Sequence, residues 1–130
     1  MKKRSGNGGI GGTIQDAPKK KVSEIKFEKS FVDLGTLNQG EKRSLKFKFT
    51  NTGTEAVKID FATGSCGCTV PDWPRKTFQP GESGSIDVEY DSKDKEGEQD
   101  NSVDVYLTAT DEKGYPLVFI AKFKAFVKTK

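Results

Sequence analysis

The stretch Ser-Leu-Lys-Phe-Lys-Phe-Thr-Asn-Thr-Gly, residues 44–53, decides the fold class. Its hydrophobic residues Leu45, Phe47 and Phe49 alternate with two lysines, which is the period of a β-strand that buries one face. A helix through the same residues would bury the lysines together with the hydrophobic side chains. The closing Asn-Thr-Gly is typical of a turn. We therefore expect a half-buried strand followed by a turn.

The same alternation recurs on both sides of this stretch, and turn-forming residues separate the repeats. Val57, Ile59 and Phe61, for example, form one expected inward set. The stretches 63–74 and 91–101 are expected to be loops, and the second is rich in charged residues. About seven strands and no helical period predict an all-β protein, an immunoglobulin-like two-sheet β-sandwich. The other expected strands lie near residues 25–27, 31–34, 86–90, 103–109 and 116–127.

Charge divides the chain into two parts. Residues 1–22 hold six basic groups and one acidic group, for a net charge of +5, whereas residues 23–130 hold 16 basic and 18 acidic groups, for a net charge of −2. The first part is rich in Gly and Lys and too poor in hydrophobic residues to offset the entropy lost on ordering it. We expect a flexible basic N-terminal arm over residues 1–22 and one sandwich domain over residues 23–130.

The residue types that are missing narrow the chemistry. The chain contains no histidine, so the commonest general base and metal ligand is absent. It has no run of about 20 hydrophobic residues that would span a membrane, and its basic start at Met1 lacks the hydrophobic segment of a signal peptide. The sequence therefore predicts a protein that is not an enzyme and uses no cofactor or metal. It also predicts that the chain is not exported, unless a native signal was removed.

The last expected strand, residues 116–127, is hydrophobic on both faces. One face carries Leu117 and Phe119, and the other, where solvent is expected, carries Val118 and Ile120. Either the arm or a loop covers this second face, or the face is exposed and docks another protein. The sequence leaves both interpretations open.

Cys66, Gly67 and Cys68 are the only residues that suggest redox or metal chemistry. Cα atoms two positions apart on an extended strand are separated by about 6.6–6.8 Å, at the upper limit of the roughly 4.4–6.8 Å that a disulfide spans. We favour two reduced thiols packed beneath Trp73. The alternatives are a labile disulfide, whose small ring would add little stability, and a metal site, although two thiols supply only half of a tetrahedral zinc site.

Several motifs in order resemble those of known families. Residues 31–37, Phe-Val-Asp-Leu-Gly-Thr-Leu, and residues 49–53, Phe-Thr-Asn-Thr-Gly, resemble the opening of Hydin-like immunoglobulin domains. Residues 65–73, Ser-Cys-Gly-Cys-Thr-Val-Pro-Asp-Trp, with Pro-Gly-Glu at 80–82, resemble a bacterial domain-of-unknown-function family marked by a Ser-Cys-Gly-Cys-Thr motif. The resemblance implies an immunoglobulin-like sandwich without known catalytic activity, usually in the envelope of Gram-negative bacteria. This chain differs in its basic arm and in lacking a signal and a lipobox cysteine.

These observations favour a structural or interaction module that docks onto the protein surface of a larger assembly, most concretely a phage capsid decoration protein assembled inside the cell. The body would dock through Val118 and Ile120, and the arm would add charge and two hydrophobic anchors. The alternatives are a secreted or cell-envelope binding module and a thiol site at Cys66 and Cys68. Nucleic acid is a minor option, through the cations of the arm. The expected partner-binding residues of the arm are Lys2, Lys3, Arg4, Ile10, Ile14, Lys19, Lys20 and Lys21.

Overall fold

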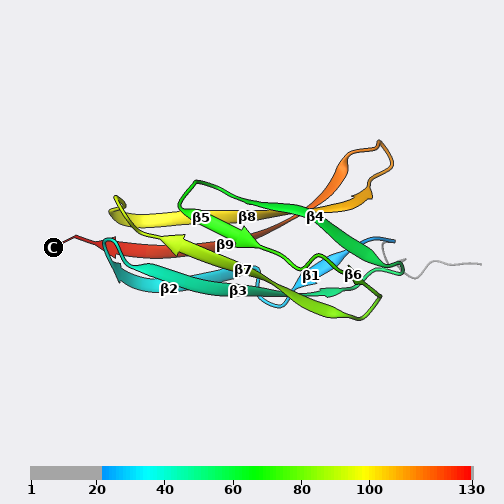
Figure 1. Cartoon of the computed structure of the whole chain (residues 1–130), viewed down its shortest axis with the longest axis horizontal. Helices are drawn as coiled ribbons and strands as arrows, with labels where there is room; N and C mark the ends of the chain where they lie inside the picture. The colour runs from blue at the N-terminus through cyan, green and yellow to red at the C-terminus, as the bar shows by residue number, and fades with distance from the viewer. Residues whose placement is uncertain (1–21, 130) are drawn as a thin grey trace, which may run out of the picture.

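The computed structural model describes residues 22–129, which form nine β-strands in two sheets and no helix (Figure 1). The strands of the smaller sheet are, in order across it, β1 (Ile25–Phe27), β3 (Lys42–Asn51), β7 (Ser83–Asp91) and β5 (Thr69–Asp72). Those of the larger sheet are β2 (Phe31–Asn38), β9 (Pro116–Lys128), β8 (Gly97–Thr110), β4 (Val57–Gly64) and β6 (Thr77–Phe78). The predicted two-sheet, all-β architecture is confirmed. The expected arm, apart from Val22, lies outside the described residues.

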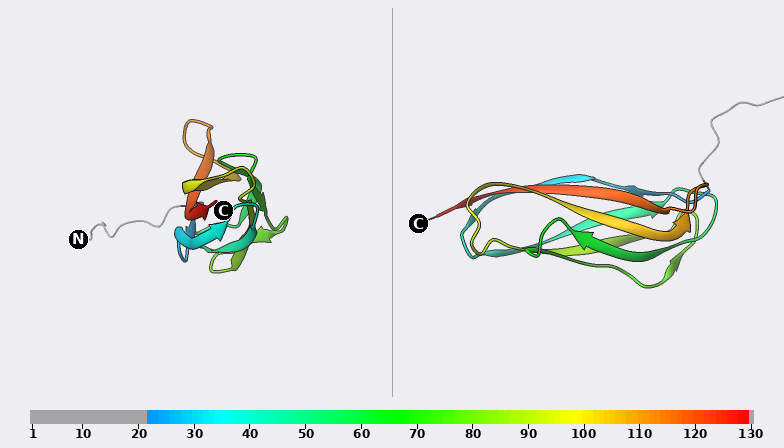
Figure 2. Two further views of the ribbon diagram at one scale, coloured as in Figure 1. Left: turned by 90° about the vertical axis from the view of Figure 1, so that its left-hand side faces the viewer. Right: turned by 90° about the horizontal axis from the view of Figure 1, so that it is seen from above.

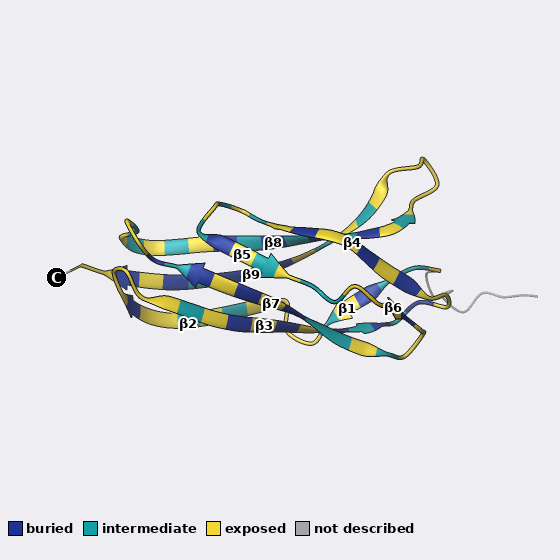
Figure 3. Ribbon diagram, in the orientation of Figure 1, coloured by how far each residue is buried: buried dark blue, intermediate teal, exposed yellow. Residues whose placement is uncertain are grey.

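The stretch that predicted the fold forms β3 at the centre of the smaller sheet. β3 pairs antiparallel with β7 in an unbroken register from Lys42 opposite Asp91 to Thr50 opposite Ser83. Its burial alternates as the sequence predicts, with the hydrophobic side chains buried and the lysines exposed. Figure 3 shows the same alternation along the other long strands. One face of each sheet therefore points inward and the other meets solvent.

The two inward faces are joined by aromatic side chains. Phe49 of β3 meets Phe78 of β6 edge to face, with ring centroids 5.1 Å apart, and Tyr90 of β7 meets Phe123 of β9 in the same way at 5.5 Å. All four residues are at most 2% exposed. Such pairs add roughly 0.5–1.5 kcal/mol beyond the burial of their area. The strands run along the long axis of the molecule, so these contacts tie the layers together along its length (Figure 2).

The two strands beyond the expected seven are β5 and the two-residue β6, and β8 is longer than expected. β5 lies inside the expected loop 63–74 and pairs with β7, and β8 begins at Gly97, inside the expected loop 91–101. In this first part of β8 the acidic side chains of Glu98 and Asp100 point outward, while the backbone pairs with β9. A strand with a polar inward position looks like a loop in sequence, because hydrophobic alternation is its main signal.

The expected inward position of Phe61 is wrong. On β4, Ile59 pairs with Leu107 of β8 and Phe61 pairs with the next residue back, Tyr106, so Asp60 is an extra residue in a β-bulge. The bulge shifts the alternation by one position. As a result Ile59 is buried, whereas Phe61 points outward and is 38% exposed.

Candidate functional site: the outer face of the larger sheet

The bulge in β4 places Phe61 in a row of hydrophobic side chains that crosses three strands. Phe61 stacks on Tyr106 of β8, with ring centroids 4.3 Å apart and planes 11° from parallel. Tyr106 in turn lies opposite Val118 of β9. Ile120, two residues along β9 on the same face, is 50% exposed, and Val118 is 41% exposed. We call these four residues, Phe61, Tyr106, Val118 and Ile120, the apolar patch.

Two carboxylates adjoin the apolar patch. Asp104 of β8 lies opposite Ile120 on one side and Thr63 of β4 on the other, and the exposed Asp60 precedes Phe61 in the bulge. None of the ion pairs within residues 22–129 uses either aspartate. The patch thus combines a flat hydrophobic surface with two negative charges that have no partner in the described part of the chain.

Further hydrophobic side chains are exposed elsewhere on the molecule. Phe31 of β2 is 52% exposed and lies opposite Lys122 of β9, one row beyond Ile120. Phe126, near the other end of β9, is 48% exposed and borders a small, mainly polar depression with Thr36 and Glu98. Phe31 extends the apolar patch toward the sheet edge, whereas Phe126 belongs to a separate place on the sheet.

The structure decides part of the prediction for the last strand. Val118 and Ile120 are exposed, so no loop among the described residues covers them. Whether the arm covers them falls outside the described residues, as do its expected binding residues. Phe61 and Tyr106 were missed by the sequence analysis. A β-bulge turns side chains to the other face of a strand, but nothing in the sequence around Asp60 indicates a bulge.

The cysteine pair differs from the favoured interpretation. Cys66 and Cys68 form a disulfide in the turn between β4 and β5, with Cα atoms 5.2 Å apart, instead of two reduced thiols. The turn shortens the Cα separation below that of an extended strand, which brings it within the range of a disulfide. Trp73 follows the far end of β5, the four-residue strand that separates it from the pair in sequence. Its ring stacks against the guanidinium of Arg75, whose Cζ atom is 3.9 Å from the ring centroid.

Other kinds of site were sought among the described residues. Within residues 22–129, no group of three or more His, Cys, Asp or Glu side chains is arranged to hold a metal ion. Over the same residues, no helix has the length and hydrophobicity needed to cross a membrane. The candidate sites in this part of the chain are therefore the apolar patch and the disulfide.

A protein-family model matches most of this sandwich. The model, described as "Protein of unknown function (DUF1573)", matches residues 25–122. No curated protein matches the chain. The expectation of a domain-of-unknown-function family is thus confirmed. The link to Hydin-like domains and the role of the Ser-Cys-Gly-Cys-Thr motif as the family's mark stay predictions.

Solved structures share the fold at low sequence identity. The ASH/PapD-like domain 7 of human CEP192 is 11% identical, with a TM-score of 0.63 over 89% of this chain and 92% of that one. The Vibrio cholerae VesB protease is 16% identical, with a TM-score of 0.60 over 78% of this chain, and this chain spans only 31% of it. The Escherichia coli chaperone DraB is 10% identical, with a TM-score of 0.57, over 82% of this chain and 57% of that one. These similarities confirm an immunoglobulin-like, PapD-like sandwich.

Proposed function

The chain belongs to the family described as "Protein of unknown function (DUF1573)", and we propose that it is a non-catalytic module that binds another protein through the apolar patch. The observation that carries this proposal is the run of exposed hydrophobic side chains across β4, β8 and β9. The absence of histidine from the sequence supports a role without catalysis.

The apolar patch is not part of the hydrophobic core of the sandwich. The side chains that bury the interior come from the opposite face of the same strands, including Ile59, Leu107 and Phe119. An outward row of two stacked aromatic rings and two aliphatic side chains leaves hydrophobic surface in water, and contiguous exposed surface of this kind marks interaction sites. Because β8 and β9 are interior strands of the sheet, the patch is held rigid and loses little entropy when a partner binds.

The chemistry around the patch specifies the partner. Tyrosine and other aromatic side chains at the centre of a flat face are typical anchors of protein interfaces. Asp60 and Asp104 would be partly desolvated by any protein that covers the patch, and an unpaired buried carboxylate is costly. We therefore infer a protein partner that presents hydrophobic side chains together with a basic group opposite Asp104.

The fold comparison agrees with protein binding without specifying the partner. DraB is a chaperone, and a sandwich similar to this one forms part of it. None of the solved structures named above is a virion protein, and attachment to a phage head stays a prediction. Binding through the arm, contact with nucleic acid, and a location in an intracellular particle or in the cell envelope likewise stay predictions.

Site-specific photo-crosslinking in the native host tests the proposal. p-Benzoylphenylalanine at Thr63, which is exposed beside the patch on β4, should yield one defined crosslinked protein. The same probe at Glu89, exposed on the outer face of the smaller sheet, is the control and should not yield it. The crosslinked protein is then purified and its affinity measured by titration calorimetry.

A purified partner allows the decisive comparison. Ile120→Lys should weaken its binding at least tenfold, because a charge replaces an anchor that the partner desolvates. Equal binding by Ile120→Lys and wild type, or identical crosslinked products at Thr63 and Glu89, would overturn the proposal. Circular dichroism of each variant shows that the sandwich is intact.

A further inference from the structure

The Cys66–Cys68 disulfide is poorly suited to stabilising the fold. It closes a ring with only Gly67 between the two cysteines, so it restricts the unfolded chain very little. β4 and β5 are each held in place by their own ladders, to β8 and β7 respectively. Both cysteines are half-buried and Gly67 is exposed, so a small thiol can approach the pair. Stabilisation of the fold therefore does not explain this disulfide.

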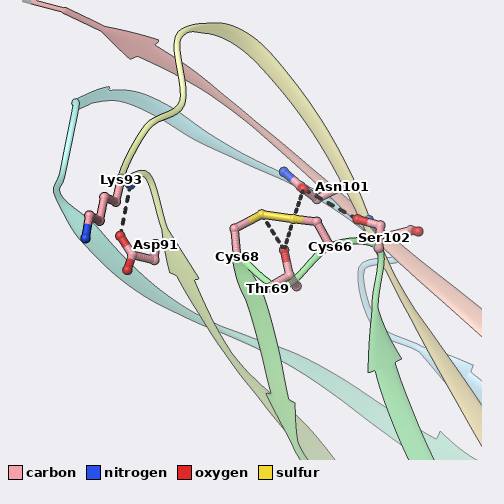
Figure 4. Close-up of a disulfide and its surroundings, with 8 residues drawn as sticks. Cys66, Cys68, Thr69, Asp91, Lys93, Asn101 and Ser102 are labelled. Atoms are coloured by element: carbon pink, nitrogen blue, oxygen red, sulfur yellow. Dashed lines mark hydrogen bonds between the residues drawn. A yellow bond between two sulfur atoms is a disulfide. The ribbon is translucent and has the colours of Figure 1, made fainter.

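Two polar side chains converge on its sulfur atoms (Figure 4). The Thr69 hydroxyl oxygen lies 3.8 Å from the Sγ atom of Cys66 and 3.8 Å from that of Cys68. Asn101 of β8 reaches across from the larger sheet, and its Oδ1 lies 3.7 Å from Cys66 Sγ. Thr69 is 3% exposed and Asn101 is 9% exposed. These are two buried, fixed groups beside a half-buried sulfur pair.

The amide of Asn101 is not satisfied by the disulfide. A disulfide sulfur carries no hydrogen, so Cys66 has nothing to donate to Oδ1. The Nδ2 group of the same amide is buried and has no hydrogen-bond partner, which is a costly arrangement for a buried donor. The two ends of a carboxamide have nearly the same shape, so turning the amide by half a turn would aim Nδ2 at Cys66. A reduced Cys66 can pair with one end or the other: its thiol donates to Oδ1, which also accepts from the Ser65 hydroxyl at 3.4 Å, and its thiolate accepts from Nδ2 once the amide has turned.

We propose that the Cys66–Cys68 disulfide is a reversible redox site that accepts two electrons from small thiols of the glutathione class. The thiolate of the reductant attacks Cys68 Sγ and forms a mixed disulfide. The Cys66–Cys68 bond breaks, and its electron pair remains on Cys66 Sγ as a thiolate. A second reductant thiolate then attacks the sulfur of the first and releases Cys68 as a thiolate. Two thiols are oxidised to one disulfide, and their two protons end on Cys66 and Cys68.

The donors fix the direction of attack. Thr69 serves both sulfur atoms equally, but only Cys66 lies beside Asn101. The thiolate that is better stabilised leaves faster, so Cys66 is the leaving group and Cys68 is the sulfur attacked. On the facing strand β7, Tyr90 lies opposite Thr69, and the backbone N–H of Asp91 donates to the Cys68 carbonyl; the other titratable residues of β7, Asp87 and Glu89, lie opposite Asp72 and Val70. Burial raises the pKa of Tyr90, which keeps its hydroxyl neutral during this chemistry.

Equilibration with glutathione tests the site. The full chain is incubated with reduced and oxidised glutathione in varied ratios and quenched with acid. Its free thiols are then counted by alkylation and mass spectrometry. We expect complete reduction in excess reduced glutathione and complete reoxidation in excess oxidised glutathione, with the melting temperature moving by no more than a few degrees. A disulfide that excess glutathione reduces only after the protein is denatured would overturn the proposal.

Variants of the two donors separate a redox role from a structural one. In the reduced protein, the pH dependence of alkylation should give Cys66 a pKa below the ordinary value of about 8.5. Asn101→Asp keeps the shape but replaces the donor with a negative charge. It should therefore raise this pKa by about one unit, which is about tenfold less thiolate at neutral pH. Thr69→Val should act in the same direction, and Thr69→Ser, which keeps the hydroxyl, should not.

A control variant and a second comparison complete the test of the two donors. Asn38→Asp, a matched change at an exposed position on β2, should leave the pKa of Cys66 unchanged. If Asn101→Asp does not fold, the comparison of Thr69→Val with Thr69→Ser decides. Equal pKa values of Cys66 in wild type and Thr69→Val would overturn the role of the donors. The Cys66→Ser/Cys68→Ser double variant should still bind the patch partner, because this site is independent of the proposed docking face.

Discussion

The outer faces of the two sheets differ in chemistry, although the smaller sheet also exposes one hydrophobic side chain, Val70 of β5. On the smaller sheet, lysines of β3 stand opposite polar or acidic residues of β7, and Lys46 forms an ion pair with Asp87 at 3.1 Å. On the larger sheet, the corresponding positions of β4, β8 and β9 carry Phe61, Tyr106 and Val118. Both sheets bury hydrophobic side chains on their inward faces, so the core does not account for this difference. The difference is what the proposed docking through the larger sheet predicts.

The largest expected effect separates the inside of the sandwich from the apolar patch. Phe49→Ala should lower the free energy of unfolding by roughly 3–5 kcal/mol, because it removes a fully buried ring that joins the two sheets. Phe61→Ala removes a ring of the same size from the outer face. It should lower the free energy of unfolding by less than about 1.5 kcal/mol, the upper range for its stacking on Tyr106. Urea denaturation of both variants measures these values, and equal losses would show that Phe61 serves the core.

A smaller effect concerns the charges of the two faces. Asp104→Lys should weaken binding of the patch partner about tenfold, or about 1.4 kcal/mol, because it places like charges opposite each other. Asp87→Lys makes the same change on the outer face of the smaller sheet and should leave the affinity unchanged. Calorimetric titrations at two salt concentrations measure both, and the loss for Asp104→Lys should shrink at high salt. Equal losses for the two variants would mean that net charge, and not the patch, governs binding.

The comparison also shows how far the sequence could predict the molecule. Alternation in residues 44–53 was enough to place β3 and its buried face, because the inward Leu45, Phe47 and Phe49 are hydrophobic and the two lysines between them point outward. The same rule placed Phe61 inside, because a single extra residue, Asp60, reverses the alternation without a compositional signal. Val118 and Ile120 were identified as an outward hydrophobic pair, but their neighbours on β4 and β8 depend on strand register. Register arises from long-range pairing, which one sequence does not display.

The prediction for the cysteine pair was limited by a similar uncertainty in local geometry. Strand spacing put the Cα atoms of Cys66 and Cys68 at the upper limit for a disulfide, and the turn that brings them to 5.2 Å could not be read from Gly67 alone. Asn101 illustrates the larger difficulty. It lies 35 residues from Cys66 in sequence and inside a segment expected to be a loop. The pairing of β8 with β4, continued by the hydrogen bond from the Ser65 N–H to the Ser102 carbonyl, places its amide beside the sulfur atoms.

The smallest expected effect compares one cross-strand pair from each outer face. A double-mutant cycle on Lys46 and Asp87 should give a coupling energy of about 0.2–1 kcal/mol, because both side chains are well exposed and water screens their attraction. A cycle on Phe61 and Tyr106 should give about 0.5–1.5 kcal/mol. The two energies overlap, so salt distinguishes them: at 1 M salt the Debye length falls to about 3 Å, and the ion-pair coupling should largely vanish. The aromatic coupling should persist, because stacking does not depend on net charge. Urea denaturation of the four proteins in each cycle, at low and high salt, measures both.

If the Phe61–Tyr106 coupling were absent, the two rings would not be a pre-ordered pair. The partner would then have to order the apolar patch itself, which would lower the affinity expected of this face.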